Sequence, residues 1–264
     1  MIYSIRKALL FVPFFLSGCS SQPNIAEQEQ LQPPVSKTTL HMQRLSTLED
    51  KDAVTINAAQ LQPGDILLSS STGVTSLGIR LFSMTGVSHA SVYLGNGEVA
   101  EAVGDGVQIV SLEDALTHSN SMVSLRNQKL TELQAAKLRI FSQNNQGRKY
   151  NYKGIIIIAP YTLTRRVCDL PLFFGKGRST CIDTLATIQI GNTPEIQKTF
   201  FCSQFVIEAF NFAGSPLTAS DALWVSPADL LHMREGDVSS FVPVQPLHYV
   251  GHLKKWNLYN AVFG

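Results

Sequence analysis

Short apolar segments separated by turn residues fill the chain from about residue 53 onward. In several of them apolar and polar positions alternate, the pattern of a half-buried strand. The predicted strands are residues 66–70, 87–94, 98–103, 107–110 and 121–126. Gly95-Asn96-Gly97 and Gly104-Asp105-Gly106 are turn sequences between three of these strands, so we expect neighbouring strands to pair in antiparallel fashion.

Other segments carry helix signals rather than strand signals. The predicted helical segments are 75–83, 111–116, 131–144, 200–213 and one that begins at Ser226. Thr131 is a suitable N-cap for the segment 131–144. Gly214-Ser215-Pro216 ends the strongly apolar segment 200–213. The very apolar segment 154–160 is too short to span a membrane and is expected in the core. Consecutive strands followed by helices indicate the α+β class.

The N-terminus has the features of a secretory signal peptide. Arg6 and Lys7 precede a nine-residue apolar run, and Leu16-Ser17-Gly18-Cys19 resembles the bacterial lipobox. In that motif the chain is cleaved before the cysteine, which is then acylated. An uncleaved anchor helix with a chance cysteine is the alternative. We expect residues 1–18 to be the signal peptide and Cys19 the lipidated residue.

Residues 19–52 are polar and rich in glutamine, with no sustained periodicity, and are interpreted as a lipid anchor and flexible tether. The absence of Asp after Cys19 favours the outer membrane, with the protein facing the periplasm. Residues 53–264 show no internal repeat and no second linker, so we expect one catalytic domain there.

Composition narrows the functional classes. The 264 residues are 44% hydrophobic and 16% charged, which is typical of a globular protein and excludes a disordered chain. A net charge of +1 is close to neutral and does not indicate a nucleic-acid-binding protein, which would normally be basic. The sequence contains no phosphate-binding glycine loop and no HExxH, CxxC or GxSxG motif. It therefore lacks the usual motifs of several large enzyme classes.

The cysteines divide into three groups. Cys19 belongs to the lipobox, and Cys202 begins the apolar helix. Cys168 and Cys181 flank a glycine- and charge-rich loop in a chain expected in an oxidising compartment, where they are either a disulfide or two free thiols. A cysteine in the first turn of a helix can be a reactive thiolate, although a free cysteine is more commonly a small buried apolar residue.

A thiolate nucleophile needs a histidine, and His89 near the start of strand 87–94 is the candidate; a structural core histidine is the alternative. Its orienting partner would be Glu101. With a three-residue loop at 95–97, Ser91 faces Glu101 and the carboxylate lies on the side of His89; with a two-residue loop it points to the opposite face. His248 and His252 are four residues apart without a third ligand nearby, so we expect no metal site.

Together, SHASVYLGNGEVAEA around His89 and the downstream FCSQFV around Cys202 resemble the YaeF/YiiX family of permuted papain-like cysteine peptidases, in the NlpC-type superfamily. The resemblance implies a circularly permuted papain-like fold, with an antiparallel half-barrel sheet packed against a Cys-bearing helix. Cys202 would be the nucleophile, His89 the general base and later acid, and Glu101 the orienting residue. Tyr150 and Tyr152 are candidates for oxyanion or substrate contacts, with simple packing as the alternative.

The expected function is therefore a membrane-anchored cysteine hydrolase that cleaves a peptide or amide substrate, with murein peptides as the candidate, and uses no cofactor. Two alternatives stay open: a lipid-directed acyl hydrolase or acyltransferase on the same fold, and a non-catalytic scaffolding lipoprotein. The segment 155–198 contains apolar and basic stretches and is expected to form either a lid or substrate wall, or plain structural filling.

Overall fold

The computed structural model describes residues 21–24, 39–44, 46–48, 53–71, 86–152, 160–169, 173, 176–189 and 200–255. The expected signal peptide 1–18, Cys19, the expected helix 75–83 and most of the apolar segment 154–160 lie outside the described residues. No helix within the described ranges is long and apolar enough to cross a membrane.

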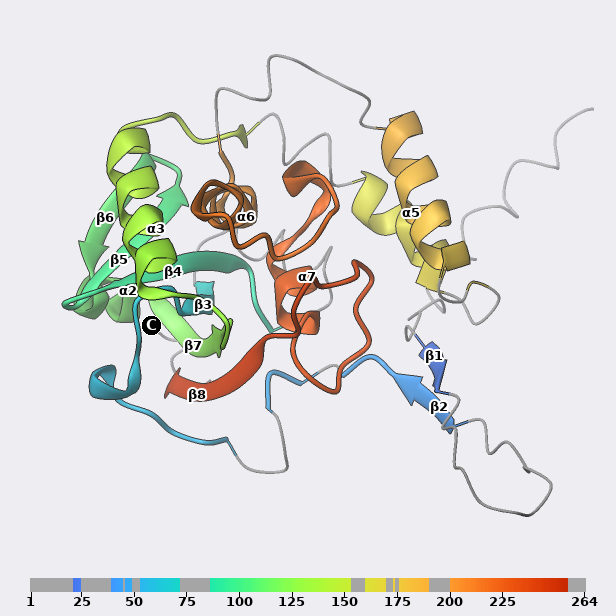
Figure 1. Ribbon diagram of the computed structural model, residues 1–264, viewed down its shortest axis with the longest axis horizontal. Helices are drawn as coiled ribbons and strands as arrows, with labels where there is room; N and C mark the ends of the chain where they lie inside the picture. Colours follow the sequence, from blue (N-terminus) through green and yellow to red (C-terminus); the bar gives the residue numbers. More distant parts are fainter. Residues whose placement is uncertain are drawn as a thin grey trace, which may run out of the picture.

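A six-stranded antiparallel sheet forms the centre of the protein (Figure 1). Its strand order is β6-β5-β4-β3-β7-β8. The strands are β3 (Ile66–Ser71), β4 (His89–Gly95), β5 (Glu98–Val103), β6 (Gly106–Ser111), β7 (Ser119–Arg126) and β8 (His248–Lys254). All five pairings are antiparallel, and helices accompany the sheet, so the α+β class is confirmed.

The hairpin between β4 and β5 combines a two-residue turn with a bulge. Asn96 and Gly97 have φ angles of 55° and 74°, as a type I′ turn requires, and Gly95 pairs with Glu98. The turn is therefore the shorter of the two loops that the sequence left open. A register shift between Tyr93 and Gly95 adds the missing residue, so Ser91 still lies opposite Glu101.

Several helices begin or end at capping residues that the sequence contains. They are α2 (Leu112–Thr117), α3 (Glu132–Asn145), α5 (Lys176–Gln189), α6 (Cys202–Ala213) and α7 (Pro227–His232), with 3-10 turns η2 (Ala58–Gln60), η3 (Arg165–Asp169) and η5 (Ala222–Trp224). Thr131 and Gln134 cap α3 reciprocally, as Ser226 and Asp229 cap α7. Helix α6 ends at Gly214, whose left-handed conformation explains the glycine.

Helix α6 packs on one face of the sheet against β4 and β5, with α3 beside it (Figure 1). Nine of its twelve residues are buried, which matches its almost uniformly apolar sequence. The ring of Phe141 on α3 lies 5.7 Å from that of Phe205 and 5.9 Å from that of Phe200. This aromatic contact fixes the start of α6, and therefore Cys202, relative to the sheet.

Three features differ from the sequence-based expectations. Strand β8 and helix α5 were not predicted. In addition, part of the polar region 19–52 forms structure. β1 (Ser21–Asn24) pairs with β2 (Thr39–Met42).

Gln43, Arg44 and Ser46, also within the segment interpreted as a tether, are hydrogen-bonded to the end of α7 and the loop after it. The side chain of Gln43 donates to the carbonyl of Val238 at 3.0 Å, and the amide of Arg44 donates to the carboxylate of Asp237 at 2.9 Å. Arg234 donates to the carbonyl of Ser46 at 2.7 Å. Contacts with the domain therefore begin upstream of residue 53.

Cys168 in η3 and Cys181 in α5 form a disulfide, with Cα atoms 5.7 Å apart. Thr164 and Gln189 add side-chain hydrogen bonds between the same two segments, at 2.8 to 3.0 Å. The region between the His89 strand and the Cys202 helix thus contains a covalently linked helical unit.

Candidate active site

Cys202 is the first residue of α6 and the free cysteine among the described residues. Phe201 precedes it as an extended N-cap residue that contributes no side-chain hydrogen bond, so the first N–H groups of the helix are available near the sulfur. The residue is only 2% exposed. A helix N-terminus with unpaired N–H groups stabilises negative charge that lies beside it.

His89 is the first residue of β4 and is held by the pairing of that strand with β3, where it lies opposite Ser69. The amide of Ser88 donates to the carbonyl of Ser69 at 2.9 Å and extends the pairing by one residue. The His89 side chain is 18% exposed, and it lies near enough to the side chain of Cys202 for the two groups to interact. Helix α6 and strand β4 are in contact, so the two residues meet across the interface between helix and sheet.

Glu101 lies on β5 and reaches the same histidine from the adjacent strand. Its Oε2 is 2.8 Å from Nε2 of His89, and its side chain is 12% exposed. Because Nε2 is occupied by the carboxylate, Nδ1 is the nitrogen left for Cys202. The structure therefore brings Cys202, His89 and Glu101 together, with a hydrogen bond between His89 and Glu101 and an interaction between His89 and Cys202.

The electrostatics of this chain favour a protonated imidazole. Burial by itself would lower the pKa of His89, but hydrogen bonds and charge attraction from Cys202 and Glu101 outweigh burial and raise the pKa to about 10. Burial likewise acts to raise the pKa of Glu101, yet the hydrogen bond and charge of His89 bring the net shift below the ordinary value. A protonated imidazole beside an ionised carboxylate is the state that these shifts describe.

Tyr150 contacts Cys202 from a third segment. Residue 150 forms a bridge with Phe200, and the amide of Asn151 donates to the carbonyl of Phe200 at 2.9 Å, so this segment runs beside the residues that precede α6. Tyr150 lies close enough to Cys202 to interact with both its backbone and its side chain. Burial, together with the nearby charge of Cys202, raises the pKa of Tyr150, so the phenol stays protonated.

Tyr152 lies at the edge of the site and is 52% exposed. Its ring is 4.9 Å from that of Tyr150 in an edge-to-face arrangement. Its hydroxyl packs so closely on Gly104 that a Cβ atom there would come within 2.5 Å of it. Tyr152 is thus held by packing, with one side of its ring open to solvent.

Gln108 on β6 was not singled out from the sequence. It lies directly opposite Glu101 and donates from Nε2 to Oε1 of that carboxylate at 2.9 Å. The period-2 pairing across the Gly104–Gly106 turn was the signal that would have placed it there. Glu101 is therefore bonded on both oxygens, to His89 and to Gln108.

His232 and His252, which lie outside this site, have structural partners. His252 is bonded to the hydroxyls of Tyr249 and Thr47 at 2.6 and 3.1 Å, and His232 to Asp237 at 3.0 Å. Within the described part of the chain no three His, Cys, Asp or Glu side chains are grouped as metal ligands would be.

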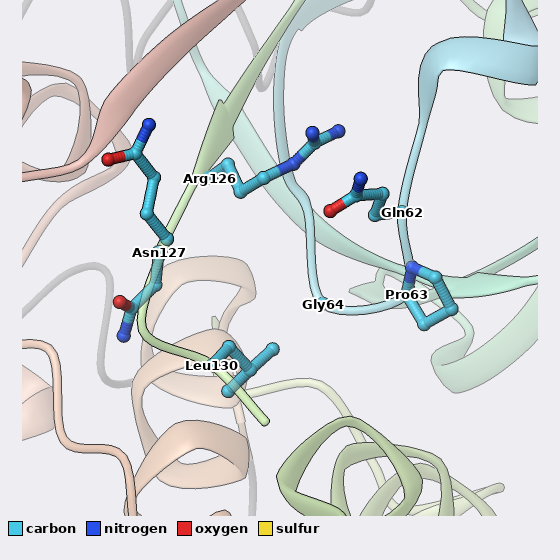
Figure 2. A pocket seen from close by; sticks show the side chains of 7 residues that line it. Gln62, Pro63, Gly64, Arg126, Asn127 and Leu130 are labelled. Carbon is cyan, nitrogen blue, oxygen red and sulfur yellow. The ribbon is translucent and has the colours of Figure 1, made fainter. Parts of the chain in front are cut away.

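A separate cavity of about 300 Å³ lies at the opposite end of α6 from Cys202 (Figure 2). Its walls come from residues 62–64 and from residues 126–128 and 130. Asn127 in its wall donates to Ser215, which follows the last turn of α6, at 3.0 Å. Arg126, which points into the same space in Figure 2, is bonded to Asp65 at 2.6 and 2.7 Å. The cavity contains none of the residues that meet at Cys202.

Comparison with known proteins gives a curated relative and solved structures of lower similarity. No family model matches the chain. The chain is 44% identical over 251 residues to the probable lipoprotein peptidase YaeF of Escherichia coli K12, covering 93% of this chain and 91% of the relative. A solved structure, described as the metalloprotein yiiX of Escherichia coli O157:H7, is similar with a TM-score of 0.44 and 19% identity, covering 75% of this chain and 99% of that one.

Proposed function

The chain belongs to the family of the probable lipoprotein peptidase YaeF, and on that basis we propose that it is a cysteine peptidase or amidase with Cys202 as nucleophile. The name of the relative supports a peptidase-type function in general. The observation that carries the cysteine mechanism is the position of His89, which is hydrogen-bonded to Glu101 and interacts with Cys202. Nucleophile, base and orienting group in this order are the constellation that thiol acyl transfer needs.

The proposed reaction has two halves. The Cys202 thiolate attacks the carbonyl carbon of the amide, a C–S bond forms, and the C–N bond breaks as the His89 imidazolium gives its proton to the leaving amine. Neutral His89 then takes a proton from water, whose oxygen attacks the thioester. The acid product leaves, and the proton on His89 restores the ion pair with the thiolate.

Tyr150 and the backbone N–H of Cys202 are the proposed oxyanion donors. Both groups lie beside the sulfur, because Tyr150 interacts with the backbone and with the side chain of Cys202. The raised pKa of Tyr150 keeps its proton available for donation. An oxyanion entering this region would receive both hydrogen bonds, which stabilises the tetrahedral intermediate. Tyr152, with its exposed ring, would contact the substrate at the rim.

The wider proposal places this chemistry on a permuted papain-like fold, since His89 on the sheet precedes Cys202 on the packed helix. The three-part organisation proposed is a signal peptide at 1–18, a lipid anchor and tether at 19–52, and the catalytic domain at 53–264. Lipidation at Cys19 would hold the enzyme at the outer membrane facing the periplasm. Murein peptides are within reach of an enzyme in that position and are the proposed substrate class.

The deciding experiment is peptide-resolved mass spectrometry of Cys202 alkylation against pH in the full chain, which reads Cys202 separately from Cys19. We expect a thiol pKa well below the reference of about 8.5, and loss of this shift in His89→Ala. A pKa at or above about 8.5 that is indifferent to His89 would contradict the proposed mechanism.

Substrate class is tested with the same protein on muropeptides released from murein by a muramidase. We expect new free amines with the wild type and none with Cys202→Ala. Ser215→Ala, at the far end of α6, is the matched control and should retain the activity, because its hydroxyl contacts Asn127 and not the site. Release of fatty acid from phospholipid vesicles, without amine release from muropeptides, would replace the peptidase assignment with an acyl hydrolase.

A further inference from the structure

Glu101 is held on both of its carboxylate oxygens. Oε2 accepts from His89 at 2.8 Å, and Oε1 accepts from the side-chain amide of Gln108 at 2.9 Å. The two bonds come from the two strands that flank β5, since β4 lies on one side and β6 on the other. A carboxylate with both oxygens engaged has no freedom to rotate away from the imidazole.

We propose that Gln108 is a positioning residue of the active site, which holds the Glu101 carboxylate in the plane and charge state that His89 requires. This inference rests on the proposed cysteine mechanism and extends it by one residue, to a chain of Cys202, His89, Glu101 and Gln108.

Geometry supports the role. Gln108 and Glu101 are directly paired residues of β6 and β5, so their side chains leave the sheet on the same face. His89, diagonal to Glu101 on β4, leaves on that face as well and reaches the carboxylate. The orientation of Gln108 is thus set by the backbone pairing of the sheet, which is more rigid than a loop.

Chemistry supports it too. An amide N–H donates a hydrogen bond to a carboxylate but carries no net charge. It therefore favours the ionised form of Glu101 and leaves the carboxylate charge to pair with the imidazolium of His89. Charged or titratable groups around Glu101 are His89 on β4, Cys202 on α6 and, at longer range, His118 at the end of α2. Gln108 is the neutral donor in this set.

The test compares Gln108→Ala and Gln108→Glu with wild type by the pH dependence of Cys202 alkylation in the full chain. Loss of one hydrogen bond to a charged group is expected to slow alkylation near pH 6 by about 10-fold in Gln108→Ala. Gln108→Glu keeps the size and shape of the side chain but replaces its amide group with a carboxyl group. In mild acid one proton shared by the two carboxyls reproduces the bond; at higher pH both ionise and repel.

The quantity compared is the rate of Cys202 alkylation in Gln108→Glu divided by the rate in the wild type. We expect this ratio to be close to one near pH 5 and to fall as the pH rises toward 8. Gln134→Ala is the matched control, because it also removes a glutamine bond, to the carbonyl of Gly214 at 2.9 Å, away from the site. Thermal melts of all variants separate misfolding from the effect sought.

A flat ratio, or Gln108→Ala rates equal to wild type with a normally activated Cys202, would overturn this inference while leaving the proposed function intact. An unactivated Cys202 in the wild type would instead remove the proposed function itself. The two failures are read from different samples and cannot be confused.

Discussion

Nε2 of His89 lies 2.8 Å from Oε2 of Glu101, although the two residues are on different strands and twelve positions apart in the chain. The contact exists because Ser91 pairs with Glu101 across the β4–β5 hairpin, which places the carboxylate diagonal to the histidine on one face of the sheet. Through this contact Nε2 is bonded to the carboxylate, so Nδ1 is the ring nitrogen available to Cys202. The orientation and the charge of the imidazole are thus decided by one contact.

The pH dependence of the reaction follows from this contact. His89, with a pKa raised to about 10, keeps its proton throughout the neutral range and loses it as the pH rises through about 10. We expect amide hydrolysis to fall above that pH, because the leaving amine then lacks its proton donor. The measurement is kcat/KM from pH 6 to 11.

Glu101→Gln is the companion variant for that profile. The carboxylate is one of the groups that raise the pKa of His89, so its neutral isostere should move the high-pH limb to lower pH. Glu98→Gln, whose carboxylate binds Arg139, is the control and should leave the limb in place. An unmoved limb in Glu101→Gln would show that the pH dependence belongs to another group.

Tyr150→Phe tests the second oxyanion donor. Removing the hydroxyl should lower kcat by roughly 10²-fold or more, with a smaller effect on KM, because the donor acts on charge that develops in the transition state. Tyr152→Phe, which keeps the exposed ring, should retain kcat. Equal kcat values for Tyr150→Phe and wild type would assign Tyr150 to packing alone.

The Cys168–Cys181 disulfide closes a short loop, with a sequence separation of 13. Replacing both residues by serine should reduce the free energy of unfolding by about 3 kcal/mol, since the loop is then free in the unfolded chain. Denaturant unfolding with and without reductant measures this loss. If reductant alone reproduces the shift in the wild type and has no effect on the double variant, the disulfide is the cause.

The local elements of this fold could be predicted from the sequence because their causes are local. Alternation of apolar and polar residues indicated β3 to β7, and the caps at Thr131 and Ser226 indicated the starts of α3 and α7. The apolar run after Phe201 indicated the buried helix that begins with Cys202. Each of these signals depends on residues within one or two turns of the chain, so no knowledge of the tertiary structure is needed to find them.

Other features were decided by the tertiary structure. The side chain of Glu101 faces His89 only because a bulge beside Leu94 compensates for the two-residue turn. Strand β8 pairs with β7, whose sequence lies more than a hundred residues upstream, and Gln108 meets Glu101 through the register of β5 and β6. A shift of one residue in a sheet reverses the face of every side chain, and the sequence pattern alone does not record such a shift. Sequence alone therefore identified Cys202, His89 and Glu101 as candidates, and the packing of sheet and helix brought them together.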